Sequence, residues 1–528
     1  MQPTGVIPRQ IASETGARAA ASRLAAAWRD GALERDRDPW QDDGALDALA
    51  SSGLLGALLS TADGGLGPSA ALIADVIRVL ATGDPALAQQ VHGHIHNVAL
   101  LAFAPPAVGE RIARDIRDAG ARFGNVNHDP SGGTVLQPLD GDGGHLLDGV
   151  KTYCTGVVGA AWLAVPAALP GERLRVALVA ADADGVDVGT DWDAFGQRAT
   201  RSVTTRFEQV FVAADHVIDP WRDPLAAHLR ELRSQLPHVA LEVGIAEAVL
   251  AEPWPASTRL REGFDAAAAH VAAARALLDE SAQRVDEASA QPTRATVGEA
   301  ALVLLAARAL AYRTSVRAAD AATRWLGDEP ARAARIDLHW RNARTHSVHD
   351  PGRWAFHHVG AHVLSGRFPS PRSPGLRERA AEIAPEPAPV PAVPQPIVAA
   401  DLDELEGALA RIAREADVAR AALADAARFV ADRSRACPEA GVQRAADEPH
   451  AILRFGELAV ALRALDALVA RAAASDNDPA AVESAERHAD RVVLRIVSDA
   501  YEIAGASALT RERGLHHHRR RLLALRAP

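Results

Sequence analysis

The segment HLLDGVKTYCTG, residues 145–156, breaks a pattern that is helical over most of the chain. Its valine, threonines and tyrosine lie between Gly149 and Gly156, a composition that favours a strand over a helix. Further segments of this kind follow up to residue 218: WLAVPAAL at 162–169, LRVALVAAD at 174–182, GVDVGTDWD at 185–193 and TTRFEQVFVAADHVI at 204–218. We therefore expect a compact β-domain over residues 121–222.

Helical patterns flank this β-domain on both sides. Residues 1–120 carry apolar residues at helical spacing, as in SAALIADVIRVLATGD at 69–84, and the same spacing returns over residues 223–366. An N-terminal helical domain, a middle β-domain and a C-terminal helical bundle together predict an α+β fold.

The last part of the chain divides in two. Residues 367–400 are dense in proline and lack apolar periodicity, which predicts an extended linker. Residues 401–528 are helical in pattern again, and residues 499–521 parallel residues 320–342 when His518 is placed opposite His339. The sequence thus predicts a second helical bundle that is a degenerate repeat of the first.

Composition excludes several classes of protein. The 528 residues carry a formal net charge of −11 without a broad basic tract, which disfavours nucleic-acid binding. The two cysteines, Cys154 and Cys437, provide neither a disulfide framework nor a metal-spaced pair. We see no signal peptide and no apolar stretch long enough to span a bilayer, so we expect a cytoplasmic protein without a membrane partner.

Four motifs carry a family resemblance. They are SSGLLGALLSTADGGLG at 51–67, DPALAQQVHGHIH at 84–96, LDGVKTYCTG at 147–156 followed by DWDAFGQRATRS at 191–202, and HWRNARTHSVHDPGRWAFHHVG at 339–360. With the order of domains, they resemble the acyl-CoA dehydrogenase superfamily, and most closely its flavin-dependent monooxygenase branch, which contains dibenzothiophene monooxygenase. The resemblance covers residues 20–366, and residues 401–528 resemble the bundle of that family alone.

The resemblance implies an oxidoreductase, a two-component monooxygenase that uses reduced FMN and O2. It would oxygenate a small aromatic, amine or sulfur compound through a C4a-(hydro)peroxyflavin, with a separate flavin reductase as partner. FAD is possible, but RWLGDEP has a single glycine, Gly327, where a double glycine would suit the ADP half of FAD. Members of the family form homo-oligomers, so we expect a dimer or a tetramer, and we hypothesise that the second bundle replaces a neighbouring subunit's bundle.

The resemblance also assigns residues. The catalytic residues would be His94, Thr155 and His349, and the cofactor-binding residues would be Asn127, Thr155, Trp192, Arg198, Ser202, Arg341 and Arg344, with Asn125 as a further contact. A dry cavity with hydrogen-bond donors is what a reactive reduced flavin requires, and histidine suits that task near neutral pH.

Spacing adds two expectations. His92 and His96 are four residues apart and share a helix face, whereas His94 points nearly opposite; no Glu accompanies the pair as in a zinc motif, so we expect no metal site. Cys154 should face away from Thr155, since neighbouring strand residues alternate.

Two alternatives stay open. An acyl-CoA dehydrogenase-like desaturase would use Asp350 as the base, in the position where such enzymes carry Glu. A non-catalytic scaffold that retained the fold would need no flavin at all.

Overall fold

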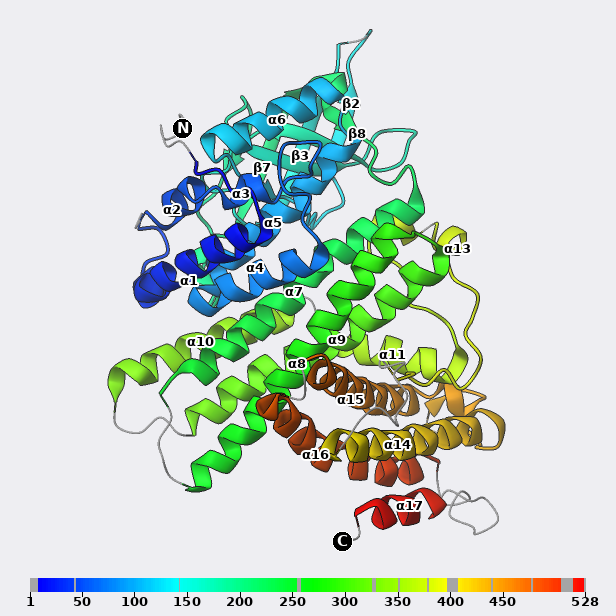
Figure 1. Ribbon diagram of the computed structural model, residues 1–528. Coiled ribbons are helices and arrows are strands. Elements are labelled where there is room, and N and C mark those ends of the chain that lie inside the picture. The colour runs from blue at the N-terminus through cyan, green and yellow to red at the C-terminus, as the bar shows by residue number, and fades with distance from the viewer. Residues whose placement is uncertain are drawn as a thin grey trace. The chain divides into compact units, whose positions relative to one another are not determined.

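The computed structural model describes residues 8–41, 44–141, 143–253, 258–324, 329–349, 352–377, 379–396, 407–437, 440–475, 478–504 and 516–526. The chain forms two compact units (Figure 1). Unit 1 comprises Met1–Glu252, Asp328–His346 and Pro371–Glu382, and unit 2 comprises Pro253–Gly327, Ser347–Ser370 and Ile383–Pro528.

Unit 1 begins with a group of helices in which α5 is buried at every residue except His96. Their bounds are α1 Glu14–Arg37, α2 Ala45–Ser51, α3 Leu54–Ala57, α4 Ala70–Gly83, α5 Pro85–Val98, the 3-10 turn η1 Ala99–Phe103 and α6 Pro106–Ala119. Asp84 begins α5, because its carboxylate accepts hydrogen bonds from the backbone N–H groups of Ala86 and Leu87 and Pro85 follows at the first helical position. Arg35 of α1 forms a buried ion pair with this cap, which ties α5 to the N-terminal helices.

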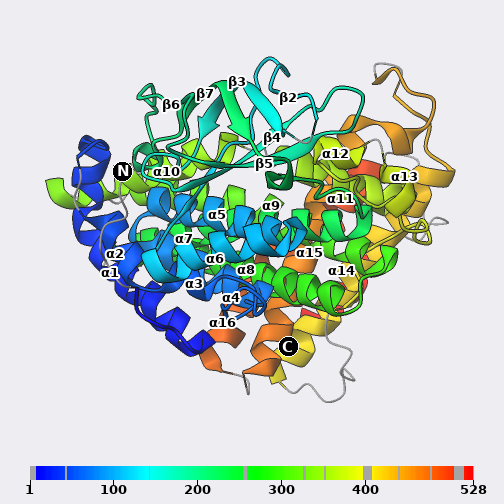
Figure 2. The ribbon, with the colours of Figure 1, turned by 90° about the horizontal axis from the view of Figure 1, so that it is seen from above.

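The β-domain of unit 1 contains two four-stranded sheets (Figure 2). One has the order β1-β4-β5-β8 and the other β2-β3-β7-β6. Side chains from both sheets, including Leu147, Leu163 and Phe207, share one buried core. The strands and 3-10 turns are β1 Phe123–Asn125, β2 Val135–Pro138, β3 His145–Cys154, β4 Trp162–Ala167, β5 Arg175–Ala180, β6 Val186–Val188, η2 Arg198–Thr200, β7 Val203–Val212, η3 Ala214–His216 and β8 Val217–Ile218.

Two long helices and a pair of short ones complete unit 1: α7 Pro224–Ala251, α10 Pro330–His349, α12 Pro374–Arg377 and α13 Ala380–Ile383. The C-terminal ends of α10 and α13, from Ser347 and from Ile383, fall in unit 2. The proline-rich segment is held more firmly than an extended linker requires. Glu231 of α7 accepts hydrogen bonds from the backbone of Arg372 (2.7 Å) and Ser373 (2.9 Å), and Leu376 is fully buried.

Unit 2 is entirely helical where the structure describes it, apart from turns and an isolated bridge. Its helices are α8 Thr258–Ala290, α9 Arg294–Thr323, α11 Arg353–Ser365, α14 Gly407–Asp432, the 3-10 turn η6 Ala445–Asp447, α15 Pro449–Ala474, α16 Pro479–Ala504 and α17 His516–Arg526. In unit 2, α15 packs on α8 and α11 as well as on α14 and α16 (Figure 1). Gly360 and Gly456 permit this: a Cβ at Gly456 would lie 1.9 Å from the Phe356 carbonyl oxygen.

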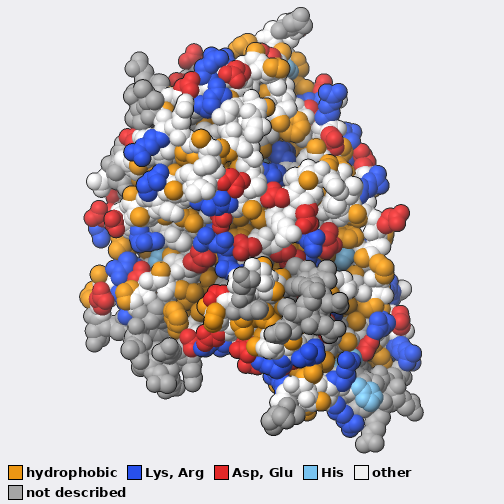
Figure 3. Space-filling view, in the orientation of Figure 1, with side chains coloured by type: hydrophobic (Ala, Val, Ile, Leu, Met, Phe, Trp, Pro, Cys, Tyr) orange, Lys and Arg blue, Asp and Glu red, His pale blue; other side chains and the backbone are white. Residues whose placement is uncertain are grey.

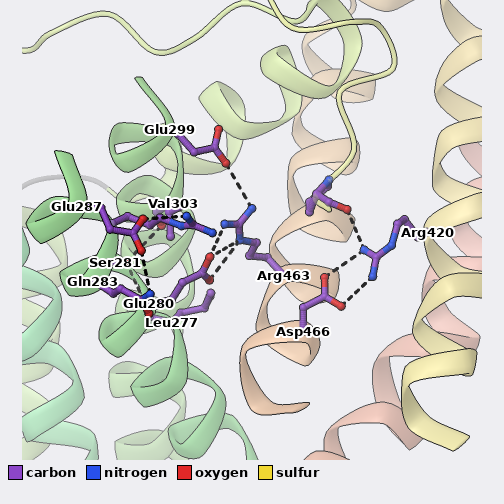
Figure 4. Close-up of polar contacts among 12 residues, drawn as sticks. Leu277, Glu280, Ser281, Gln283, Glu287, Glu299, Val303, Arg420, Arg463 and Asp466 are labelled. Carbon is purple, nitrogen blue, oxygen red and sulfur yellow. Dashed lines mark hydrogen bonds and ion pairs between the residues drawn. The ribbon is translucent and has the colours of Figure 1, made fainter. Parts of the chain in front are cut away.

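Buried ion pairs join the C-terminal helices to the rest of unit 2. Arg463 of α15 binds Glu280 of α8, with Nε 2.9 Å from Oε1, and Arg420 of α14 binds Asp466 of α15 at 2.9 Å (Figure 4). The side chains of Arg463 and Glu280 are 8% and 5% exposed. Residues beyond 406 are therefore an integral part of unit 2.

The predicted α+β fold is confirmed. Cys154 is buried in the β-domain core. The compact units divide the chain differently from the predicted domains, since α7 and α10 group with unit 1 while α8, α9 and α11 group with the C-terminal helices. The expectation that no stretch is long and apolar enough to span a bilayer was wrong. Among the described residues, α9 has the length and composition of a membrane span, but 67% of its apolar window is buried inside the protein, as in a core helix.

Candidate functional site

Unit 1 contains a cavity of about 420 Å³ whose walls come from α5, the β-domain, α7 and the segment after α11. Apolar lining residues are Leu100, Ala164, Pro166, Leu174, Val176 and Trp221. Polar lining residues include His96, Asn127, Arg230 and Ser234. The cavity can therefore accommodate a small molecule that has both an apolar body and a polar group.

His96 is the histidine that α5 presents to this cavity. Every residue of α5 except His96 is buried, and His96 lines the cavity. Burial, and then the charge of Arg230, lower the pKa of His96 to about 3, which keeps the ring neutral at neutral pH. A neutral imidazole has one N–H donor and one acceptor nitrogen.

A path of polar contacts leads from His96 to the β-domain. The amide nitrogen of Asn127 lies 3.4 Å from His96 Nε2 and donates to the side chain of Asn125 at 2.7 Å. The backbone N–H of Asn125 donates to the Thr155 carbonyl at 2.9 Å. The hydroxyls of Thr155 and Ser202 lie 2.8 Å apart, and both side chains are buried. Four predicted contact residues are thus brought together.

The backbone near Thr155 and Ser202 is strained. Tyr153, Gln197 and Arg201 have φ angles of 55°, 53° and 46°, in the left-handed region that residues other than glycine seldom adopt. Such residues cost on the order of 1–3 kcal/mol each and cluster at functional sites. The strain thus marks the two segments, 147–156 and 191–202, that the sequence singled out.

Aromatic side chains lie beside this strained region. Tyr153 is 60% exposed, and its ring lies 6.4 Å from the ring of Trp192 in an edge-to-face arrangement. Trp192 donates a hydrogen bond to the Gln197 carbonyl at 3.3 Å. Further along, Phe195 contacts Trp340. These rings provide an accessible apolar surface on the segments that carry Thr155 and Ser202.

The three predicted arginines lie elsewhere in the same unit and make protein contacts. Arg341 binds both carboxylate oxygens of Asp36, at 2.9 and 2.7 Å, and also Asp337 at 2.7 Å. Arg198 donates to the Asp36 carbonyl at 2.6 Å. The Arg344 guanidinium lies 5.8 Å from the centre of the Trp340 ring.

The structure separates His94 from the cavity. His94 is fully buried, is not a cavity-lining residue, and accepts a hydrogen bond at Nδ1 from the backbone N–H of Phe123 at 3.2 Å. Burial lowers its pKa to about 3, although the Leu55 backbone acts in the opposite direction. The side chain of His349, and Asp350, lie outside the described residues.

Sequence reasoning missed a chain of buried histidines that begins at the cavity wall. His92 Nε2 donates to the carbonyl of Ser234 at 2.9 Å, and its ring is in edge contact with the ring of His238. His238 Nδ1 lies 3.2 Å from His346 Nε2, and His346 Nδ1 lies 3.0 Å from a carboxylate oxygen of Glu242.

The chain is linear: within the described part of the molecule, no group of three or more His, Cys, Asp or Glu residues is placed to hold a metal ion. The spacing of four between His238 and Glu242 on α7 was the one sequence signal available. It could not reveal the partners on α5 and α10.

The chain was compared with known proteins. No family model matches it. It is 28% identical to a probable FMNH2-dependent monooxygenase, SfnC, of Pseudomonas putida, over 67% of this chain and 96% of that protein. It is also 28% identical to a dibenzothiophene monooxygenase of Mycolicibacterium goodii, over 66% of this chain and 94% of that protein.

A solved structure gives the same picture. The FMN-bound TdsC from Paenibacillus sp. A11-2 superposes with a TM-score of 0.63 at 28% identity, covering 67% of this chain and 99% of that chain. About one third of the chain has no counterpart in these proteins, which are otherwise matched over nearly their whole length. The chain is therefore a homologue of the flavin-dependent monooxygenases that have the acyl-CoA dehydrogenase-like fold.

Proposed function

We propose that this protein is a flavin-dependent monooxygenase that uses reduced FMN and O2 to oxygenate a small organic molecule containing an aromatic, amine or sulfur group. One observation carries the proposal. In a homologue of such enzymes, a cavity with a neutral histidine, His96, is linked through Asn127 and Asn125 to the Thr155–Ser202 hydroxyl pair.

The residues on these segments fit a flavin. Its ring system needs an apolar surface and hydrogen-bonding groups at its polar edge. The accessible ring of Tyr153, the neighbouring Trp192 and the hydroxyls of Thr155 and Ser202 supply both, on a backbone held in an unusual conformation. When bound, reduced FMN would supply the two electrons needed to insert one oxygen atom of O2 into the substrate and to reduce the other to water.

The chain's own residues would position the substrate and limit its contact with water. The apolar lining residues would reduce contact of the substrate with water, and His96 and Asn127 would offer it hydrogen bonds. Because His96 is neutral, it can either donate or accept a hydrogen bond at the substrate.

We therefore assign to His96 the role that the resemblance gave to His94. For His349 the catalytic role stays a prediction. Arg198 and Arg341 have carboxylate and carbonyl partners that account for their positions, so we propose that both hold the protein segments around the site, with Arg344 as the remaining candidate for a cofactor contact.

The proposed function implies a flavin reductase as partner. A chain that takes its flavin reduced requires a separate flavin reductase, and we propose a homo-oligomer in the cytoplasm, as a dimer or a tetramer. Basic and acidic side chains are interspersed over the face shown in Figure 3. The relatives favour oxygenation over a desaturase or a scaffold.

Titration of the purified full chain with FMN under anaerobic reducing conditions, followed by mixing with O2, tests the proposal. We expect saturable FMN binding, and we expect His96→Ala to bind FMN as the wild type does but to release hydrogen peroxide several-fold faster after mixing. His94→Ala is the matched control, since it removes a buried histidine from the same helix without altering the cavity wall. If neither FMN nor FAD binds in either redox state, the proposal fails.

A further inference from the structure

The charged side chains around the cavity are not all neutralised by partners. Lys151 lies 3.3 Å from Asp129 and forms an ion pair with it. The two carboxylate oxygens of Glu231 accept hydrogen bonds from the backbone N–H groups of Arg372 and Ser373. Arg230 is the exception: in the described part of the chain its guanidinium has neither a hydrogen bond nor an ion pair within bonding distance.

Arg230 is nevertheless largely shielded from solvent. Its Nε is a buried donor without a hydrogen-bond partner. Burial lowers the pKa of Arg230 to about 10, while Glu231 acts in the opposite direction, so the guanidinium is charged at neutral pH. A shielded charge without a partner is destabilising, because the water it loses is not replaced by another hydrogen-bonding group.

The position of Arg230 suggests what its partner is. Arg230 lines the cavity and is close enough to His96 for its charge to lower the pKa of that histidine. The same cavity also has apolar lining residues, among them Leu100, Pro166 and Val176. A molecule that fills this space would bring an acidic group to Arg230 and an apolar body to these residues. Guanidinium groups bind planar or tetrahedral oxyanions through two parallel hydrogen bonds.

We propose that Arg230 binds the anionic group of the organic substrate, and that the substrate class is therefore a small amphiphilic anion such as a sulfonate, a sulfinate or a carboxylate. That the bound anion is the substrate rests on the proposed function; that the cavity binds such an anion does not. The phosphate of FMN has the same chemistry, and the experiment below separates these two sources.

Binding to the full chain is measured by isothermal titration calorimetry with benzenesulfonate and with methyl phenyl sulfone, which is similar in shape but neutral. The variants are Arg230→Gln, Arg230→Lys and the control Arg222→Gln, which changes an exposed arginine outside the cavity. We expect the wild type and Arg222→Gln to prefer the sulfonate, Arg230→Gln to bind the sulfonate about 10- to 100-fold more weakly, and Arg230→Lys to lie between them. Affinity for the sulfone should stay unchanged throughout.

Thermal unfolding provides a second readout. Because Arg230 has no hydrogen-bond or ion-pair partner among the described residues, Arg230→Gln should not lower the melting temperature of the ligand-free protein, but it should abolish the stabilisation by benzenesulfonate. A lower melting temperature of the ligand-free variant, with unchanged sulfonate affinity, would mean a structural role and would overturn the proposal. Equal binding of sulfonate and sulfone by the wild type would overturn it too.

Flavin binding distinguishes the remaining outcomes. If Arg230→Gln weakens FMN but not riboflavin, and leaves benzenesulfonate unaffected, Arg230 is a flavin-phosphate ligand and the substrate assignment is overturned. If neither the wild type nor any variant binds flavin, but the wild type still binds the sulfonate through Arg230, the proposed monooxygenase function fails while the anion site stands.

Discussion

The replacement Arg463→Met should destabilise unit 2 strongly. Arg463 and Glu280 are both nearly inaccessible, and among the described residues Glu280 is bonded to Arg463 alone. The variant leaves the Glu280 carboxylate buried without its partner, and close enough to Asp466 for the two acids to repel. Breaking a buried ion pair from one side costs about 3–5 kcal/mol.

The converse replacement should cost less. In Glu280→Gln, Arg463 keeps the carboxylate of Glu299 at 3.7 Å and the amide oxygen of the new side chain. The double variant Arg463→Met with Glu280→Gln removes both charges, so it should recover most of the loss in Arg463→Met, because burying an ion pair is close to neutral relative to apolar residues of similar volume.

Urea denaturation of the full chain, followed by circular dichroism at neutral pH, measures these differences in the free energy of unfolding. The reasoning would be refuted if Arg463→Met lost less than about 1 kcal/mol, below the range for a broken buried pair. It would also be refuted if the double variant were as unstable as Arg463→Met. Either result would mean that the C-terminal helices are attached loosely to the rest of unit 2.

Three other perturbations have defined outcomes. Gly456→Ala should lower the free energy of unfolding, measured by thermal denaturation, by about 1–3 kcal/mol, because its Cβ would lie 1.9 Å from a backbone oxygen. Gly109→Ala, whose Cβ would lie 3.7 Å from the nearest such oxygen, should leave stability unchanged or raise it. Glu242→Leu should cost about 1–3 kcal/mol by leaving His346 Nδ1 without its acceptor, and Glu242→Gln should cost less because it keeps an acceptor; equal losses in denaturant would contradict this. The pKa of Asp129 is held well below its usual range by hydrogen bonds from Thr134 and by the charge of Lys151, which together outweigh burial. Its carboxylate therefore stabilises the fold above about pH 4, and the advantage of wild type over Asp129→Asn should shrink as the pH falls further.

Much of the site could be anticipated from local sequence. The segments that carry Thr155 and Ser202 were recognisable from their motifs, and the structure places these two hydroxyls 2.8 Å apart. Asn127, which the sequence predicted as a cofactor contact, lines the cavity. Arg198 and Arg341 were harder to assign, because a guanidinium near an expected site has the same sequence pattern whether it binds a ligand or, as here, Asp36.

The sequence by itself determined the order of helices, β-domain and helices, since apolar periodicity and strand composition act over a few residues at a time. It also revealed the resemblance to the flavin-dependent monooxygenases, because the four motifs are local strings. Only the tertiary structure decided which histidine of α5 faces the cavity. An amphipathic helix reveals its inward face, but α5 is buried on every side except at His96, so its sequence does not specify its rotation. The cavity, Arg230 and the histidine chain join segments more than a hundred residues apart, and such contacts depend on how the elements pack rather than on any local pattern.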